Sequence, residues 1–202
     1  MAMRNLLAAW TALALIAWTP AARAAPADPA AQRVESLCVG VLDAVKQAKG
    51  AGVQARARKI QPVIEESFDI GVMAQFAIGP TAWAKVSPAE RAALVAALTR
   101  HTAARYAQEF DSYTGQKCVV DPAVQTRGPD KLVKSQIVEP HDSSSVNYRL
   151  RQYGGAWKVI DVYFNGVSQM TVQRADFAAL VSEGGAPAVV AKLKALTAKM
   201  LS

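Results

Sequence analysis

The hydrophobic period of this chain changes twice, and that change constrains the fold more than any other feature. Up to about residue 113, apolar residues recur at three- and four-residue steps, as they do on one face of a helix. Between about 117 and 165 they alternate as in strands, and the helical period returns at about 171–201. Short connections make neighbouring strands antiparallel. The order helices, sheet, helices predicts an α+β fold rather than an alternating α/β fold.

Four helices are expected before the sheet. The first three are expected at 33–49, 53–67 and 68–78. Pro62 predicts either a kink in the second helix or the first turn of a separate one. The fourth helix has a strong start, because Ser87 precedes Pro88 and Glu90 follows three residues after the Ser. It is expected to reach about Ser112.

Four strands are expected to form a meander, in the segments CVVDPAVQTR, LVKSQIVEP, SVNYRLRQY and AWKVIDVYF. Pro122 predicts that the first strand is bulged or lies at an edge. The last strand is apolar on both faces apart from Lys158 and Asp161, which predicts a central position in the sheet. Gly184-Gly185 is expected to separate the following helix from a final helix at 187–201.

The N-terminus has the pattern of a secretory signal. A basic start, MAMRN, precedes the apolar run LLAAWTALALIAW and the small residues Ala22 and Ala24. We expect cleavage after Ala24, with a retained anchor as the alternative. The exported chain would be 25–202, a length that suits one domain. It would carry 21 basic and 16 acidic residues, a net charge of +5, because Arg4 and Arg23 leave with the signal.

Charge and cysteine content exclude several classes of site. The mild basic balance favours anionic lipid or acidic partner surfaces, whereas the clustered basic stripe of a nucleic-acid-binding protein is missing from the sequence. Cys38 and Cys118 allow one disulfide, and two buried thiols are the alternative. These cysteines and the histidines His101 and His141 are too scattered for a metal site. No phosphate-cradling glycine loop is present, so no cofactor is expected.

Large apolar residues are abundant on both sides of the expected sheet. Taken one by one, most of them suit a plain core. A curved sheet that packs against several helices leaves a cavity between the layers, with an apolar lining like that of a ligand site. The expected lining residues are Phe68, Met73, Phe76, Ile78, Trp83, Leu98, Tyr106, Phe110, Ile137, Tyr148, Leu150, Trp157, Val159, Val162, Phe164 and Met170.

Four ordered segments of the chain carry a resemblance to a known family. FDIGVMAQFAIGPTAW, SPAERAALVAAL, ARYAQEFDSYTGQ and WKVIDVYFNGVSQMTVQRADF together resemble the MlaC-type, toluene-tolerance family of periplasmic lipid carriers. The stretch from FDSYTGQ to WKVIDVYFNG is similar to the hopanoid-associated HpnM branch. The turn Gly166-Val167-Ser168 lacks the inserted residue typical of that branch, which leaves phospholipid and hopanoid open as ligands.

The resemblance implies an NTF2-like curved antiparallel sheet of about four strands, with helices closing a deep apolar pocket around lipid tails. It also implies a monomeric carrier that shuttles lipid between the inner and outer membranes. The implied partners are an inner-membrane transporter, of ABC type for MlaC-like and RND type for HpnM-like proteins, and an outer-membrane complex.

Two other functions compete with the carrier. NTF2-like cavities also host isomerases and dehydratases, and Asp161 is the candidate base for such an enzyme. Lys158 and Arg174 offer that carboxylate a structural partner instead, and His101 lacks the partner pattern of a nucleophile-base pair. We therefore expect no enzyme and a structural Asp161 that anchors either the following turn or a neighbouring basic side chain, near Asn165-Gly166. An accessory protein of a transport complex with a solid core is the third alternative.

Overall fold

The computed structural model describes residues 27–110, 113, 115–139 and 142–202. The predicted signal peptide, its cleavage site after Ala24 and the predicted helix end at Ser112 lie outside these residues, as does His141. No helix within the described part is long and apolar enough to cross a membrane.

Helices and an antiparallel sheet make up the protein, which confirms the α+β prediction. The helices are α1 (Pro29–Gln47), α2 (Gly52–Ser67), α3 (Ile70–Ile78), α4 (Pro80–Trp83), α5 (Pro88–Glu109) and α6 (Gln169–Leu201). The first helix begins four residues earlier than predicted, because the Asp28 carboxylate accepts a hydrogen bond from the Ala30 amide and Pro29 occupies the first helical position. Pro62 lies inside α2 without ending it.

The predicted start of α5 is confirmed in atomic detail. Ser87 Oγ accepts a hydrogen bond from the Glu90 amide at 3.3 Å, and the Glu90 carboxylate accepts one from the Ser87 amide at 2.8 Å. This reciprocal pair satisfies two donors that a helix N-terminus leaves free.

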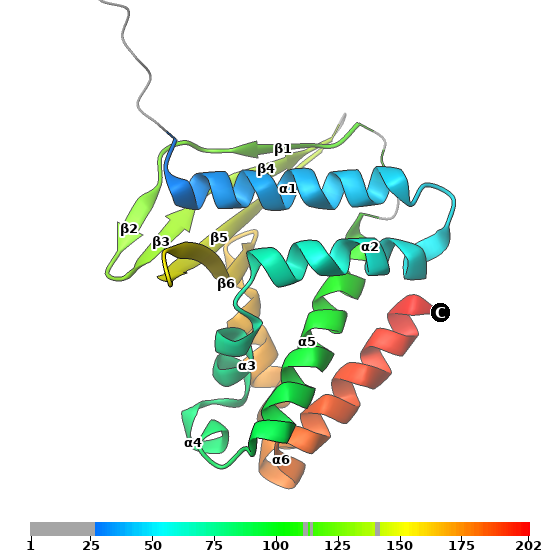
Figure 1. Ribbon diagram of the computed structural model, residues 1–202, viewed down its shortest axis with the longest axis vertical. Coiled ribbons are helices and arrows are strands. Elements are labelled where there is room, and N and C mark those ends of the chain that lie inside the picture. Colours follow the sequence, from blue (N-terminus) through cyan, green and yellow to red (C-terminus); the bar gives the residue numbers. More distant parts are fainter. Residues whose placement is uncertain (1–26, 111–112, 114, 140–141) are drawn as a thin grey trace, which may run out of the picture.

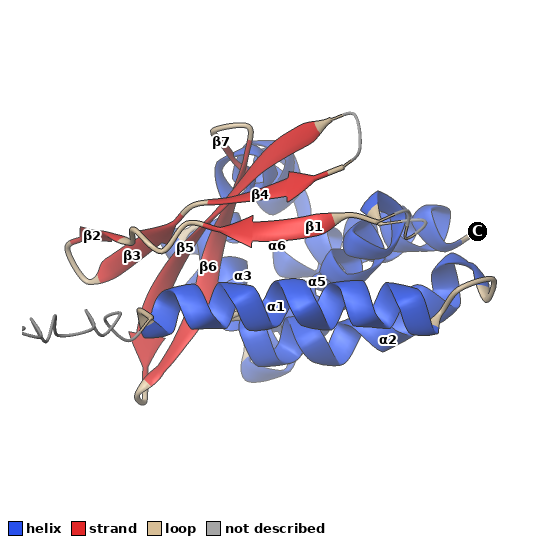
Figure 2. Ribbon diagram, turned by 90° about the horizontal axis from the view of Figure 1, so that it is seen from above, coloured by secondary structure: helices blue, strands red, loops and turns tan. Residues whose placement is uncertain are grey.

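In the described part of the chain, seven strands form the sheet: β1 (Lys117–Val120), β2 (Gln125–Arg127), β3 (Asp130–Val133), β4 (Ser135–Val138), β5 (Ser143–Tyr153), β6 (Ala156–Phe164) and β7 (Val167–Ser168). The first two predicted strands are each broken in two. The first gives β1 and β2, and the second gives β3 and β4. β1 pairs with β4 and β2 pairs with β3, and both β3 and β4 pair with β5. The antiparallel meander is therefore present in bent form (Figure 2). Pro122 lies in the break of the edge segment, as predicted.

The predicted central position of the last strand is wrong. β6 pairs with β5 along its length but with β7 only at its end, so it lies near an edge of the sheet. Its other side receives the chain between α2 and α3, where the Asp69 amide donates to the Val159 carbonyl at 2.9 Å. α1, α2, α3 and α6 all contact β6, which buries Val159 and Ile160.

The helices lie together on one side of the sheet, and α6 turns back on itself (Figure 1). Its first half descends from β7, and its second half returns beside α5 to the C-terminus. The break is at Gly185, whose φ of 60° and ψ of −152° are not helical, which confirms the predicted Gly184-Gly185 separation.

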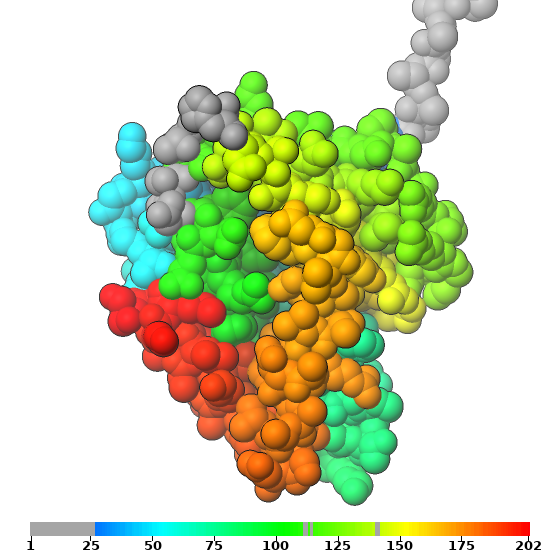
Figure 3. All heavy atoms as spheres, turned by 180° about the vertical axis from the view of Figure 1, so that it is seen from behind, coloured from blue at the N-terminus to red at the C-terminus, as the bar shows by residue number. Residues whose placement is uncertain are grey.

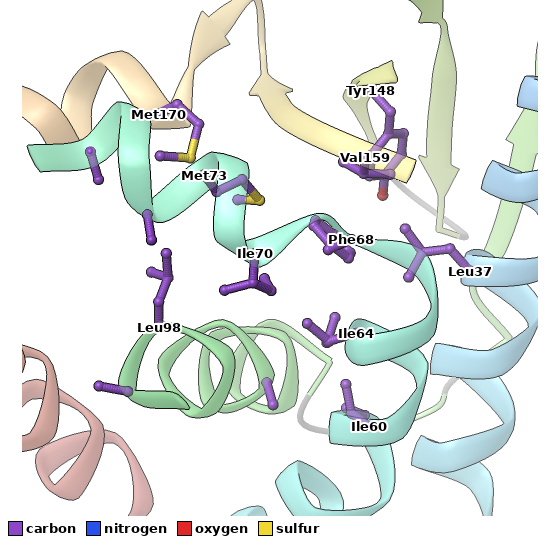
Figure 4. Close-up of a cluster of buried hydrophobic side chains, with 14 of the residues drawn as sticks. Leu37, Ile60, Ile64, Phe68, Ile70, Met73, Leu98, Tyr148, Val159 and Met170 are labelled. Atoms are coloured by element: carbon purple, nitrogen blue, oxygen red, sulfur yellow. The ribbon is translucent and has the colours of Figure 1, made fainter. Parts of the chain in front are cut away.

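A disulfide between Cys38 and Cys118 joins α1 to β1, at a sequence separation of 80 residues. The largest fully buried apolar side chains lie on α1, α2, α5, α6 and the sheet, and include Leu37, Ile60, Ile64, Leu94, Leu98, Leu150 and Leu193. The core thus fills the space between the sheet and the helices (Figure 4).

Candidate functional site

A cavity of about 250 Å³ lies where α5 and the start of α6 meet the sheet. α5 and the first half of α6 lie side by side on this face of the molecule (Figure 3). The lining of the cavity comes from the C-terminal end of α2, the start of α3, α5, the strands β4, β5 and β6, and the first turns of α6. Those residues are Phe68, Met73, His101, Thr102, Arg105, Tyr106, Glu109, Phe110, Ile137, Glu139, Asp142, Ser143, Ser144, Val146, Tyr148, Val162, Phe164, Gln169, Met170 and Gln173.

The structure brings nine of the sixteen predicted lining residues together in the wall of this cavity. They are Phe68, Met73, Tyr106, Phe110, Ile137, Tyr148, Val162, Phe164 and Met170. The strand residues among them share the inner face of the sheet, where Tyr148 lies opposite Val162, and Val146 opposite Phe164. Met73 and Met170 face each other below the sheet (Figure 4). Flexible thioethers give this part of the wall the ability to adapt to a ligand.

The other seven predicted residues do not line this cavity. Leu98, Leu150 and Val159 are fully buried in the solid core. Ile78 and Trp83 lie at α3 and α4, where the Arg91 guanidinium covers the indole. The other two are covered by cations: Arg174 lies over Phe76, and the Lys131 ammonium lies 4.7 Å from the Trp157 ring centre. Hydrophobic period shows which face is buried, but it does not show where two layers separate.

Two tyrosines contribute to the wall of the cavity. Tyr106 comes from α5 and Tyr148 from β5, and both line the cavity. The Tyr148 side chain hangs from the sheet with its oxygen toward Phe68 (Figure 4). Burial raises the pKa of Tyr148 to about 12 and raises that of Tyr106 well above its ordinary value. Both hydroxyl groups therefore stay protonated at neutral pH.

Aromatic rings hold Tyr106 in place. The Phe68 ring meets it edge-on at a centroid distance of 6.1 Å, and Phe110 stacks against it at 6.3 Å. The hydroxyl pair thus lies among hydrocarbon groups.

A polar rim surrounds the cavity, and the sequence prediction missed it. Its members are Thr102, Arg105, Glu109, Glu139, Asp142, Ser143, Ser144, Gln169 and Gln173. Arg105 donates to the Gln169 side-chain oxygen at 3.4 Å, which connects α5 to α6. On α5 a signal existed, because Thr102 and Glu109 lie four residues before and three residues after Tyr106, on the same side of the helix. Arg105 lies three residues after Thr102 and four before Glu109, and so borders that side.

His101 borders the cavity and is neutral. Its side chain is 5% exposed, and Nδ1 lies 3.3 Å from the Thr197 hydroxyl, which itself donates to the Leu193 carbonyl. Nδ1 therefore carries the proton and donates to Thr197. Burial, and secondarily the nearby Arg105, lower the His101 pKa to about 4. The residue thus joins α5 to the second half of α6.

Asp161 has structural partners. It is 7% exposed, accepts a hydrogen bond from Ser168 Oγ at 2.7 Å and accepts a second from the Met170 amide at 3.2 Å. It is not part of the cavity wall. The predicted anchoring of the turn after β6 is confirmed, but the expected basic partners are wrong. Lys158 instead donates to the Glu66 carbonyl, and Arg174 lies over Phe76.

In the described part of the chain, no group of three or more His, Cys, Asp and Glu side chains is placed to hold a metal ion.

A sheet and a helical layer that enclose an apolar cavity with a polar rim define a ligand-binding protein. The chain belongs to the MlaC family, whose model, described as MlaC protein, matches residues 35–195. A similar solved structure is a phospholipid-binding protein from Ralstonia solanacearum in complex with a phospholipid. It is 19% identical, with a TM-score of 0.76, and the match covers 87% of this chain and 100% of that one. This likeness shows a shared fold. No curated protein matches the chain.

Proposed function

We propose that this protein is a periplasmic lipid carrier that encloses lipid tails in the cavity between α5, α6 and the sheet. The observation that carries the proposal is the ordered lining of that cavity, apolar inside and polar at the rim. Membership of the MlaC family and the fold shared with a phospholipid-binding protein support it. Burial of acyl chains stabilises such a complex by about 0.8 kcal/mol per CH₂ group.

Phospholipid is the ligand we favour. The fold neighbour is described as a phospholipid-binding protein, and the turn Gly166-Val167-Ser168 lacks the insertion typical of the hopanoid-associated branch. A hopanoid remains the second candidate, because Phe110, Val162 and Phe164, which line the cavity, belong to the segments that resemble HpnM proteins. Organic extracts of the purified protein distinguish the two.

Loading requires the helices to move. Sites for drug-sized ligands have volumes of about 300 to 1,000 Å³, and the cavity here has about 250 Å³. Two acyl chains therefore need additional space. Separation of α5 and α6 from β5 and β6 supplies it, since the inner cavity lies between these elements.

Export and transfer complete the proposed function. The sequence pattern before Ala24 directs the chain to the periplasm, and the mature net charge of +5 favours transient contact with anionic membranes or acidic partners. There the protein shuttles lipid as a monomer between an inner-membrane transporter, of ABC or RND type, and an outer-membrane complex.

An isomerase or dehydratase that uses Asp161 fits the geometry less well. Both oxygens of that carboxylate accept hydrogen bonds from the start of α6. His101, the imidazole at the cavity, is neutral and bonded to Thr197. Neither side chain is therefore positioned as a general base toward a substrate in the cavity.

Mass spectrometry of organic extracts tests the proposal directly. Protein purified without detergent is expected to carry phospholipid, and a delipidated sample is expected to take up a fluorescent phospholipid. Extracts without lipid, together with no uptake, would refute the carrier function and favour the accessory-protein alternative.

A matched pair of variants localises the binding. Val162→Trp fills the cavity wall and is expected to abolish uptake, whereas Val119→Trp adds the same side chain on β1, where the valine is exposed. Equal uptake by the two variants would place the lipid elsewhere.

A further inference from the structure

Tyr106 and Tyr148 together bring two hydroxyl protons to the wall of one cavity, and at most one of them can be used in a bond between the two side chains. Each phenol has one O–H donor, and a bond between two phenols consumes one of them. The described part of the chain offers neither hydroxyl another hydrogen-bond partner. One donor is therefore left over in the cavity of this structure.

The surroundings make that donor selective. Phe68 and Phe110 contact the Tyr106 ring, and Tyr148 is only 3% exposed. A polar group in an apolar environment gains more from a partner than it would in water, and costs more without one. A ligand that brings an acceptor oxygen to this point is therefore favoured over one that brings hydrocarbon.

The order of groups along α5 indicates which acceptor fits. Tyr106 is next to Arg105 and three residues before Glu109, two rim residues, while its ring faces the apolar interior formed by Phe68 and Phe110. In a diacyl glycerolipid, ester carbonyls lie at the same junction, between the polar head group and the hydrocarbon tails. The pocket and this class of lipid thus have matching sequences of polar and apolar groups.

We propose that the Tyr106–Tyr148 hydroxyl pair donates a hydrogen bond to an acyl ester carbonyl of the bound lipid, and so selects diacyl glycerolipids over lipids without an ester. This inference rests on the proposed lipid binding and adds a specificity determinant to it. A site built around a hydrogen bond discriminates against an analogue that lacks the corresponding group.

Ester and ether forms of one lipid provide the test. The delipidated protein is loaded with a fluorescent phosphatidylglycerol, which is then displaced by dioctanoyl phosphatidylglycerol or by its dioctyl ether analogue. The two competitors share the head group and nearly the same chains, but the ether form lacks both carbonyls. The ester form is expected to displace the probe at about 3- to 10-fold lower concentration, the value of one net hydrogen bond.

The double variant Tyr106→Phe/Tyr148→Phe removes both hydroxyls and keeps both rings. It is expected to lose the preference for the ester, so that the ester and ether competitors displace the probe at equal concentration. Tyr153→Phe, at an exposed tyrosine near the end of β5, serves as the control and keeps the preference.

The outcomes separate the two proposals. Displacement by both lipids at equal concentration in the wild type, or an ester preference that persists in the double variant, would overturn the inference and leave the carrier function intact. No loading of the fluorescent lipid at all would overturn the carrier function itself.

Discussion

Ser168 and Asp161 are hydrogen-bonded to each other at the junction between the sheet and α6. Ser168 Oγ donates to the Asp161 carboxylate at 2.7 Å and accepts from the Thr171 amide at 3.1 Å, so it caps the helix and contacts the strand at once. The second carboxylate oxygen of Asp161 accepts a hydrogen bond from the Met170 amide. The start of α6, which forms one side of the cavity, is thereby fixed to β6.

Asp161→Ala is expected to lower the free energy of unfolding by about 1 to 3 kcal/mol, because it leaves the buried Met170 amide and the Ser168 hydroxyl without their acceptor. Urea unfolding at pH 7 measures this loss. Asp176→Ala, at an exposed position of the same helix, is the control. An unchanged urea midpoint for Asp161→Ala would contradict the structural role.

Local signals in the sequence predict much of the fold but only part of the site. The capping residues Ser87 and Glu90 act within one helical turn, and Gly185 acts through its own backbone, so sequence alone locates both. The position of β6 depends on a contact with Asp69, 90 residues away from Val159, which no local pattern encodes.

The same limit applies to the cavity. Leu98 and Tyr106 lie on one helix and both carry large side chains, yet Leu98 is in the core and Tyr106 in the cavity wall. The difference depends on which elements of the assembled layers surround each residue, which the helical pattern of α5 does not encode. Polar rim residues such as Arg105 were missed because a search for apolar periodicity passes over them.

The neutral His101 predicts a dependence of stability on pH. Its ordinary pKa is 6.5 and its pKa in the folded protein is about 4. As the pH falls from 6.5 to 4, the unfolded chain binds a proton that the folded chain does not, so the folded state loses up to about 3 kcal/mol. His101→Gln is expected to remove this loss. Urea unfolding of both proteins at pH 7.5 and pH 4.5 measures it; parallel losses in wild type and variant would exclude His101 as the cause.

Asp130 predicts a second loss of stability in acid, at a lower pH than the loss due to His101. It is 1% exposed and accepts hydrogen bonds from Arg149 Nε at 2.6 Å and from Arg151 Nη2 at 3.0 Å. Burial acts to raise the pKa of this carboxyl, but the hydrogen bonds from Arg151 and Arg149 outweigh it, so the pKa lies below its ordinary value of 3.8. The stability that it contributes is therefore present above pH 3.8 and is lost as the pH falls through the lowered value.

Asp130→Asn is expected to destabilise the protein by about 2 kcal/mol at pH 7, with a smaller difference from the wild type below pH 3.8. Thermal unfolding across this range gives both values. Asp43→Asn, which disrupts an exposed pair with Lys46, is expected to have little effect. A difference that stays constant down to pH 2 would show that the arginines do not set the contribution of Asp130.

The disulfide predicts sensitivity to reduction. Cys38→Ala/Cys118→Ala opens a loop closed over 80 residues, which corresponds to about 4 kcal/mol of stability in the loop-entropy model. The variant is expected to unfold at a lower urea concentration than the oxidised wild type, and a reductant is expected to shift only the wild type. If reduction leaves the wild-type midpoint unchanged, the bond makes no net contribution.

The two edges of the sheet affect how the protein behaves at high concentration. An open strand edge is a template for pairing with another chain. One edge of the sheet is formed by β1 and β2, and it is interrupted between them, around Pro122. At the other edge, β6 pairs with the backbone at Asp69 and with β7. In the part of the chain that the structure describes, neither edge of the sheet presents a long, regular row of free amides and carbonyls. The protein is thus built to resist aggregation by strand addition, even while its helices separate from the sheet.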